Sequence, residues 1–170
     1  AKLFRLGLYG VHRQHQRREI QKAVRLRRAA QVIGGLLLPP GAKEFLDELR
    51  SLCQVIIISD TFTQFASPLM KKLGMPTIFC NSLEVAPSGE ITGFKMRIEN
   101  SKLTTVKALQ SIGYDTIASG DSYNDLGMIK ASKAGFLFKS TDKIKADNPA
   151  IPAFENYSEL LAAIKEQLKK

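Results

Sequence analysis

The sequence predicts an α/β protein with a mostly parallel β-sheet in a three-layer arrangement, and three observations carry this prediction. From Leu36 onward, apolar runs alternate with segments whose apolar residues recur at helical spacing, which is the pattern of βαβ units. The run QVIIISD at residues 54–60 is continuously apolar before its polar end, as in a central strand buried on both faces. A chain of 170 residues, 44% of them hydrophobic, can bury one sizeable core. We therefore expect a single domain over residues 1–170.

The first half of this region contains two predicted helices and two predicted strands. One helix is expected to begin after the turn at Pro39-Pro40-Gly41, because apolar residues recur one turn apart beyond it. The strand at residues 54–60 follows. A second helix is expected over residues 62–73, since Gly74 is a natural residue to end it. A short strand at residues 77–80 completes this half.

The second half begins with a predicted β-hairpin at residues 83–96, where two alternating segments flank Pro87-Ser88-Gly89. Ser101 is expected to cap a helix that runs through Ile112. The remaining pattern predicts a strand and loop at residues 116–125, a helix through Ala131, a strand at residues 134–138 and an amphipathic helix beginning near Ser158.

The net charge of +9 is concentrated near the start of the sequence. Residues 1–30 hold nine lysines and arginines against a single acidic residue, Glu19, so that residues 12–35 form an atypical basic segment. Such a segment can bind phosphates, but it contains no interleaved stacking aromatics and no recognisable pattern for binding RNA or DNA. We therefore expect a solvated helical face there, and nucleic acid is not an expected partner.

The sequence favours a cytoplasmic protein without membrane contact. No apolar run approaches the roughly 18 to 20 residues that cross a bilayer, and arginine and lysine interrupt the first residues too often for a signal peptide. Cys53 and Cys80 lie in different apolar segments without the spacing of metal ligands. We expect them to be free thiols that carry out no redox chemistry.

Three polar clusters follow predicted strands or begin a predicted helix. They are Ser59-Asp60-Thr61, Lys102 and the run from Gly120 to Asp125, which includes Asn124. Taken singly, these clusters match a helix cap, a solvated lysine and an ordinary turn. In open α/β sheets, however, ligands bind outside the carboxyl ends of the strands. Hydroxyl and ammonium groups suit phosphoryl oxygens and carboxylates suit Mg²⁺, so together the clusters predict a phosphate and magnesium site.

At these residues the chain resembles the haloacid dehalogenase (HAD) superfamily and, within it, the phosphoserine phosphatases. It is most similar to the branch that includes phosphoserine:homoserine phosphotransferases. The resemblance covers residues 36–170 and rests on VIIISDT, on the lysine of NSKLTTVKAL and on SGDSYND. It implies a Rossmann-like HAD core with a β-hairpin insertion and a reduced cap.

The resemblance also implies roles for single residues. Ser59 is expected to supply the phosphate-binding hydroxyl and Lys102 the family's lysine. Asp121 is expected to coordinate Mg²⁺, with Asp125 as the second metal-site carboxylate that supports it. The remaining implied substrate contacts are Asp60, Thr61 and Asn124.

The first motif of the family departs from its usual form. In the family, an aspartate after the first strand attacks phosphorus and forms an aspartyl-phosphate, and a carboxylate two residues later transfers protons. The matching segment here is RLGLYGV at residues 5–11, where Gly7 and Tyr9 replace both carboxylates, unless this segment is an unrelated strand. Asp47 and Asp115 are not expected to replace the missing carboxylates. Asp47 belongs to the helix before the strand that ends at Ser59, and Asp115 precedes its own strand, at the edge of the sheet opposite the site.

The segment that follows is also unusual for the family. Members place a small helical cap between the first motif and the helix that begins here near Pro40. In this sequence about 28 arginine-rich residues stand in its place, which predicts a reduced cap and a site more open to water. One of the arginines Arg13, Arg17 and Arg18 is a candidate for binding a substrate carboxylate.

The functional prediction is a Mg²⁺-dependent phosphomonoester hydrolase of phosphoserine phosphatase type, in serine biosynthesis, acting on a small phosphorylated metabolite. Transfer to homoserine shares the same covalent intermediate and stays open. One alternative is a non-catalytic phosphate- or partner-binding domain with a basic N-terminal segment. Another is that residues 1–30 are altered relative to an ordinary enzyme, by truncation or frameshift. The hairpin at residues 83–96 is compatible with a homodimer.

Overall fold

The computed structural model describes residues 2–5 and 38–169, and within these residues seven strands form one sheet in the order β4-β3-β2-β1-β5-β6-β7. The strands are β1 (Lys2–Arg5), β2 (Gln54–Phe62), β3 (Thr77–Val85), β4 (Ile91–Lys95), β5 (Asp115–Gly120), β6 (Ala134–Phe138) and β7 (Ala153–Phe154). Gly7, Tyr9, the basic segment and the predicted reduced cap lie outside the described residues.

Nearly all neighbouring strands of this sheet are parallel. β1 is central and pairs in parallel with β2 on one side and with β5 on the other, and only the pairing of β3 with β4 is antiparallel within the described strands. Parallel neighbours require crossover connections, which the helices between them supply. The prediction of an α/β protein with a mostly parallel sheet and a hairpin is confirmed.

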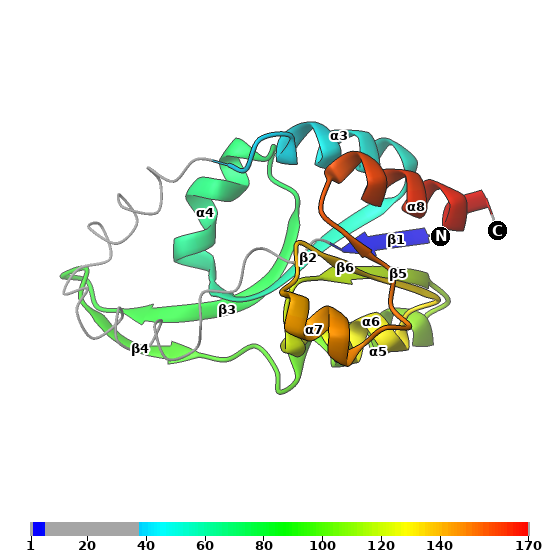
Figure 1. Cartoon of the computed structure of the whole chain (residues 1–170). Coiled ribbons are helices and arrows are strands. Elements are labelled where there is room, and N and C mark those ends of the chain that lie inside the picture. The colour runs from blue at the N-terminus through cyan, green and yellow to red at the C-terminus, as the bar shows by residue number, and fades with distance from the viewer. Residues whose placement is uncertain (1, 6–37, 170) are drawn as a thin grey trace.

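The helices lie on both faces of the sheet, as Figure 1 shows. They are α3 (Ala42–Leu52), α4 (Thr63–Lys72), α5 (Ser101–Ser111), α6 (Tyr123–Ala131), α7 (Asp142–Asp147) and α8 (Tyr157–Lys169). Because side chains alternate along a strand, Ile57 packs with α3, α4 and α8, whereas its neighbours Ile56 and Ile58 face α5. α6 and α7 pack on the α5 face, against Ala118 and Leu137.

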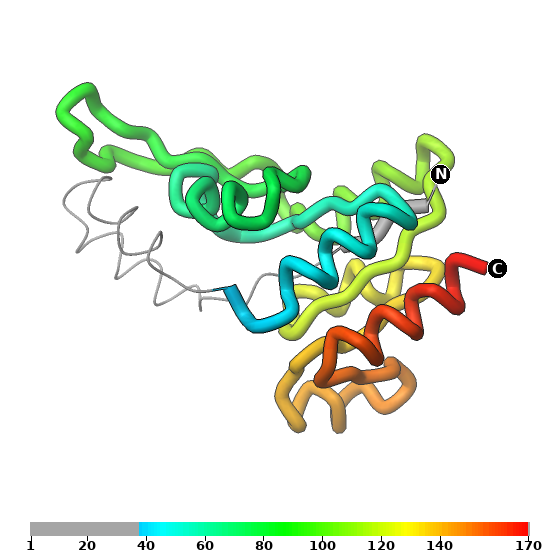
Figure 2. Tube along the Cα trace, turned by 90° about the horizontal axis from the view of Figure 1, so that it is seen from above, coloured from blue at the N-terminus to red at the C-terminus, as the bar shows by residue number. Residues whose placement is uncertain are grey.

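The predicted strand at residues 77–80 and the first hairpin strand are one continuous strand, which corrects the sequence prediction. β3 pairs in parallel with β2 near its start, and from Ser82 onward it pairs with β4. A change of partner needs no break in the backbone, so nothing in the sequence marks it. Figure 2 shows the resulting β3–β4 hairpin extending away from α3 and α8.

The start of α5 also differs from the prediction. Ser101 is the first residue of the helix and not its cap, because Asn100 occupies the N-cap position in the left-handed conformation with φ of 47°. Asparagine tolerates this conformation better than most residues. The helix ends at Ser111, and Gly113 follows with φ of 89°, as a glycine at a helix end does. The sequence reading did not predict the short elements α7 and β7.

Cys53 and Cys80 are free thiols, as predicted, and both are partly buried. Burial raises the pKa of the Cys53 thiol to about 11, so this group stays protonated at neutral pH. In the described part of the chain, no helix is long and apolar enough to span a bilayer.

Candidate active site

The carboxyl end of β2 carries the first group of predicted site residues. Ser59 is buried, and its Oγ accepts a hydrogen bond of 3.3 Å from the backbone N–H of Thr61. The carbonyl oxygen of Asp60 accepts a hydrogen bond of 3.0 Å from the Asn81 side chain on β3. β2 continues to Phe62, beyond the predicted end at residue 60. The Ser-Asp-Thr segment is therefore held in extended backbone at the rim of the sheet.

The carboxyl end of β5 carries the second group, and Asp125 organises it. Its Oδ2 accepts three hydrogen bonds, from the backbone N–H of Asp121 at 3.2 Å, from the backbone N–H of Ser122 at 3.1 Å and from Ser122 Oγ at 2.8 Å. Asp125 is the third residue of α6, so its charge also favours the positive end of that helix. The Ser140 hydroxyl donates to the Asp121 carbonyl at 2.8 Å.

Gly120, the last residue of β5, makes this compact turn possible. A Cβ atom at this position would lie 2.4 Å from both Cβ and Cγ of Asp125. Real Cβ atoms do not approach other heavy atoms this closely, so a larger residue would displace the Asp125 carboxylate. The glycine of the SGDSYND motif is therefore needed for close packing and not for a special φ angle.

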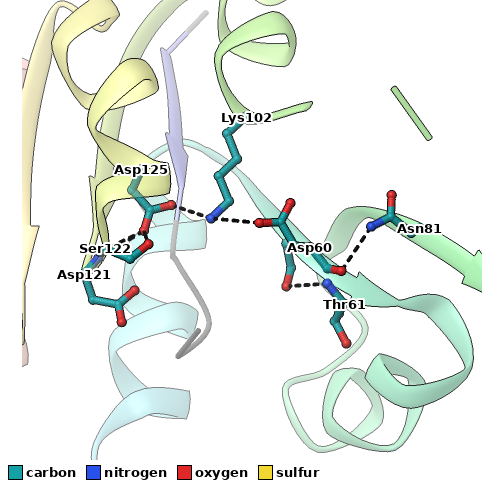
Figure 3. Close-up of polar contacts among 8 residues, drawn as sticks. Asp60, Thr61, Asn81, Lys102, Asp121, Ser122 and Asp125 are labelled. Atoms are coloured by element: carbon teal, nitrogen blue, oxygen red, sulfur yellow. Dashed lines mark hydrogen bonds and ion pairs between the residues drawn. The ribbon is translucent and has the colours of Figure 1, made fainter. Parts of the chain in front are cut away.

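Lys102, in the first turn of α5, joins the two groups (Figure 3). Its Nζ lies 2.7 Å from Asp125 Oδ1 and 3.7 Å from Asp60 Oδ2. The lysine side chain is only 14% exposed and that of Asp125 only 1%. Because β1 lies between β2 and β5 in the sheet, Lys102 bridges the two strand ends that flank the end of β1.

The structure thus brings most of the predicted site residues to one rim of the sheet, although their chemical roles stay predictions. Lys102 contacts the carboxylate of Asp60 and that of Asp125, and the backbone N–H of Asp121 donates a hydrogen bond to Asp125. Asn124 is exposed in the first turn of α6, and its side chain takes no part in these contacts. Asp115 lies at the other end of β5 and Asp47 on α3, as the sequence predicts.

Asn81 is a site residue that sequence reasoning missed. It is 3% exposed, and besides donating to Asp60 it accepts a hydrogen bond of 3.0 Å from the backbone N–H of Arg97 through Oδ1. Its own carbonyl accepts from the Thr63 hydroxyl at 3.1 Å. Asn81 therefore ties the end of β2 to the segment that leads into α5 and Lys102. Its signal in the sequence is an asparagine directly after the apolar run at residues 78–80.

Arg97 strengthens the same connection. Its guanidinium lies 4.8 Å from the centroid of the Phe79 ring, and it donates a hydrogen bond of 2.5 Å to the Thr105 hydroxyl on α5. A cation over an aromatic face is attracted to the ring and holds the side chain in place. Arg97 is thus engaged within the protein, between β3 and α5.

The donor set at the rim suits a magnesium ion with few protein ligands. Among the described residues, no group of three or more histidine, cysteine, aspartate or glutamate side chains could hold a metal. Mg²⁺ commonly binds through one or two carboxylates and keeps waters or phosphate oxygens as its other ligands. Asp121 can serve in this way at the end of β5. Asp125 is already engaged through both carboxylate oxygens, which suits a supporting role.

A second polar contact fixes the outer side of α6. The hydroxyl of Tyr123, the first residue of α6, donates to the Asp147 carboxylate on α7. This hydrogen bond raises the pKa of Tyr123 and lowers the pKa of Asp147, and the contact of Asp147 with Lys143 acts in the same direction on the carboxylate. These groups are exposed, so the contact positions α6 but adds little stability.

Comparisons with known proteins agree with the resemblance drawn from the motifs. The sequence pattern of the haloacid dehalogenase-like hydrolase family matches residues 2–130. Phosphoserine phosphatase ThrH of Pseudomonas aeruginosa is 42% identical over 130 residues, which cover 76% of this chain and 63% of the relative. A phosphoserine phosphatase of Pseudomonas syringae pv. tomato is 40% identical over 129 residues, which cover 76% of this chain and 54% of the relative. The chain thus spans less than two thirds of these relatives.

Solved structures support the fold. A phosphoserine phosphatase in its apo form superposes with a TM-score of 0.70 at 22% identity, covering 92% of this chain and 93% of the other. A substrate-bound phosphoserine phosphatase complex gives a TM-score of 0.68 at 22% identity, covering 95% and 96%. At this level of identity the likeness concerns the fold alone, and it confirms the predicted Rossmann-like core.

Proposed function

The chain belongs to the haloacid dehalogenase-like hydrolase family, and from this premise we propose that it is a Mg²⁺-dependent hydrolase of small phosphomonoesters such as phosphoserine. Relatives that are 42% and 40% identical carry the name phosphoserine phosphatase, which supports this substrate class. The observation that carries the proposal is the placement of Lys102 between Asp125 and Asp60, at the rim where the central strands of the sheet end.

Each residue at this rim has a separate proposed role in binding a phosphate group. Lys102 supplies a positive charge and Ser59 a hydroxyl, both suited to the phosphoryl oxygens. Asp121 would hold Mg²⁺, with Asp125 keeping the Asp121 loop and Lys102 in place. When bound, the ion would neutralise charge on the phosphoryl oxygens. Thr61 follows Asp60 on β2 and Asn124 precedes Asp125 on α6, and both are candidates for contact with the rest of the substrate.

The attacking carboxylate of the family is absent at Gly7, and the proton-transferring carboxylate is absent at Tyr9. Phosphoryl transfer depends mainly on positioning and electrostatics, but this route still requires an attacking oxygen. We therefore expect the chain to bind phosphoserine and to hydrolyse it slowly. The same two residues favour a second candidate function, a phosphate-binding domain without turnover.

Phosphate release from phosphoserine, measured with and without Mg²⁺, tests the proposal. The unaltered chain is compared with a double variant that carries Gly7→Asp and Tyr9→Glu. We expect the double variant to be faster, and the addition of Lys102→Ala to lower its kcat/KM by about 100-fold, the usual cost of one charge-stabilising group. Lys133→Ala is the matched control, because Lys133 pairs with Asp115 away from the site. Adding homoserine as an acceptor separates transfer from hydrolysis.

Three results would contradict the proposal. Rapid turnover by the unaltered chain that survives Lys102→Ala would place the chemistry elsewhere. No turnover by either chain, together with tight binding of phosphoserine, would favour the binding domain. No binding of any phosphomonoester would exclude both functions.

A further inference from the structure

Asp121, the carboxylate proposed to hold Mg²⁺, is held through both polar groups of its backbone. Its N–H donates a hydrogen bond of 3.2 Å to Asp125 Oδ2, and its carbonyl oxygen accepts one of 2.8 Å from the Ser140 hydroxyl. With both groups held, the direction in which the side chain leaves the backbone is set. Ser140 therefore takes part in deciding where the Asp121 carboxylate lies.

The hydrogen bond of Ser140 differs in kind from those of three other serines. The hydroxyls of Ser51, Ser111 and Ser132 donate to carbonyl oxygens three or four residues earlier, at 2.6, 2.7 and 2.9 Å. Such local bonds are common for serine hydroxyls in and beside helices. Ser140 instead reaches a residue 19 positions away, just beyond the end of β5. Its hydrogen bond thus joins two strand ends of the sheet.

Lys139 turns the chain so that Ser140 can reach Asp121. It follows β6, which pairs with β5, and its φ of 51° lies in the left-handed region that lysine rarely adopts. Its backbone N–H donates to the Phe154 carbonyl at 2.9 Å, and its Nζ lies 4.8 Å from the centroid of the Tyr157 ring. Strain of this kind persists only where surrounding contacts hold it, and it is frequent at functional sites.

The surroundings of Ser140 keep its hydroxyl in this position. The next residue, Thr141, is the N-cap of α7, and its hydroxyl oxygen accepts a hydrogen bond of 3.4 Å from the backbone N–H of Ile144. Ser140 itself is 7% exposed. Loss of a buried donor leaves its acceptor without that hydrogen bond, and water does not readily replace it there.

We propose that Ser140 is a positioning residue that holds Asp121 in the place where it binds Mg²⁺. An ion with few protein ligands depends strongly on each of them, so displacement of one carboxylate weakens its binding. Ser140 contacts neither the ion nor the substrate in this role and acts only through Asp121. The inference rests on the proposed Mg²⁺-dependent function, and it names a residue on which the affinity for the ion depends.

Binding of Mn²⁺, an ion that takes the same oxygen ligands as Mg²⁺, tests this inference without a measurement of turnover. Electron paramagnetic resonance reports free Mn²⁺ during titration of the whole chain, and competition with Mg²⁺ gives the Kd for Mg²⁺. We expect Ser140→Ala to raise both Kd values about tenfold, the lower end of the range for residues that hold a metal ligand in place. Asp121→Asn, which removes the charge of the ligand itself, should weaken binding more.

Two further variants make the result specific. Ser132→Ala is the matched control, because it removes a hydroxyl–carbonyl hydrogen bond of 2.9 Å just before the start of β6, at the other end of the sheet. It should leave both Kd values unchanged. Ser140→Thr keeps the hydroxyl and should retain the affinity of the unaltered chain. Circular dichroism and urea denaturation of each variant verify that the fold is intact before the Kd values are compared.

The outcomes separate this inference from the function on which it rests. If Asp121→Asn weakens binding of Mn²⁺ but Ser140→Ala does not, the role of Ser140 is wrong and the function stands. Equal weakening by Ser140→Ala and Ser132→Ala, or by Ser140→Ala and Ser140→Thr, also overturns the inference, because the hydrogen bond is then not the cause.

The remaining outcomes concern the metal site itself. If Asp121→Asn binds Mn²⁺ as tightly as the unaltered chain, the ion lies elsewhere and the inference is wrong. If the unaltered chain binds neither ion, the Mg²⁺-dependent function fails and the inference fails with it. A loss of affinity in Ser140→Ala that is absent in Ser132→Ala and in Ser140→Thr supports the proposal.

Discussion

Two lysine–aspartate pairs lie toward opposite ends of β5, and their geometry is nearly the same. Lys102 and Asp125 are 2.7 Å apart at the carboxyl end, and Lys133 and Asp115 are 2.8 Å apart at the amino end. Their surroundings differ. The first pair is 14% and 1% exposed, and the second is 48% and 57% exposed.

The distance between the two charged atoms alone says little about what an ion pair does. Water and salt screen the exposed pair, so its charges interact weakly. The buried pair has lost its water, and it is tolerable only because Asp125 accepts additional hydrogen bonds from Asp121 and Ser122. The buried charges at the carboxyl end of the sheet thus lower the stability of the fold, which is typical of a functional site. The exposed charges at the amino end carry no such cost.

Removal of the buried carboxylate should have the largest effect on stability. Asp125→Ala leaves Lys102 without its main partner and leaves the three hydrogen bonds to Oδ2 without an acceptor. We expect the free energy of unfolding to fall by about 3–5 kcal/mol, as when one partner of a buried pair is removed. Urea denaturation measures this value.

The matched control is Asp115→Ala, which removes the carboxylate of the exposed pair. It should lower the free energy of unfolding by at most about 1 kcal/mol. Equal losses in the two variants would show that burial does not distinguish the two ends. Asp125→Asn keeps an acceptor oxygen, so its loss in the free energy of unfolding should lie between those of Asp125→Ala and Asp115→Ala.

Gly120→Ala tests the same end of the sheet through packing, and its expected effect is smaller. The added Cβ would lie 2.4 Å from Cβ and Cγ of Asp125, so that α6 or the carboxylate must shift. Overpacking of this kind costs about 1–3 kcal/mol, again measured by urea denaturation.

Gly127→Ala in α6 is the control for this substitution. Its new Cβ would meet Leu103 at an ordinary contact distance of 3.6 Å, and alanine favours a helix more than glycine does. We expect a neutral or stabilising effect there. If Gly127→Ala lowers the free energy of unfolding as much as Gly120→Ala does, then α6 tolerates no added side chain in general, and the contact with Asp125 is not the cause.

The rim that holds the candidate site could be predicted from the sequence because it follows from strand direction. Ser59 and Asp121 stand where apolar runs end, and parallel strands place such ends at one edge of the sheet. Lys102 could be added because it stands at the start of a predicted helix and resembles the lysine of a family motif. These inferences use order along the chain and need no knowledge of packing.

Asn81 and Arg97 could not be predicted in this way, because their roles depend on which segments become neighbours. The hydrogen bonds of Asn81 join β2 to the segment before α5, and the two segments are far apart in the sequence. The change of partner along β3 is equally invisible, since both of its pairings suit the same extended residues. Asn100 takes the cap position of α5 through a left-handed backbone, which the serine after it did not reveal.

The smallest expected effect is the coupling between Lys133 and Asp115, the exposed pair. A double-mutant cycle with Lys133→Met and Asp115→Asn isolates the interaction of the pair from the other effects of each substitution. We expect a coupling energy of at most about 1 kcal/mol in low salt. Because both side chains are about half exposed, this coupling should become undetectable in about 1 M NaCl, where charges are screened within about 3 Å.

The corresponding cycle at the other end of β5 uses Lys102→Met and Asp125→Asn. Its coupling energy should be larger and should change little between the two salt concentrations, because ions cannot enter between side chains that are 14% and 1% exposed. If the coupling at Lys133 resists salt as well, its charges are shielded by something other than burial, and the two ends of the sheet do not differ in the way proposed. Salt dependence, and not the size of either coupling alone, therefore decides whether burial separates the site from the rest of the sheet.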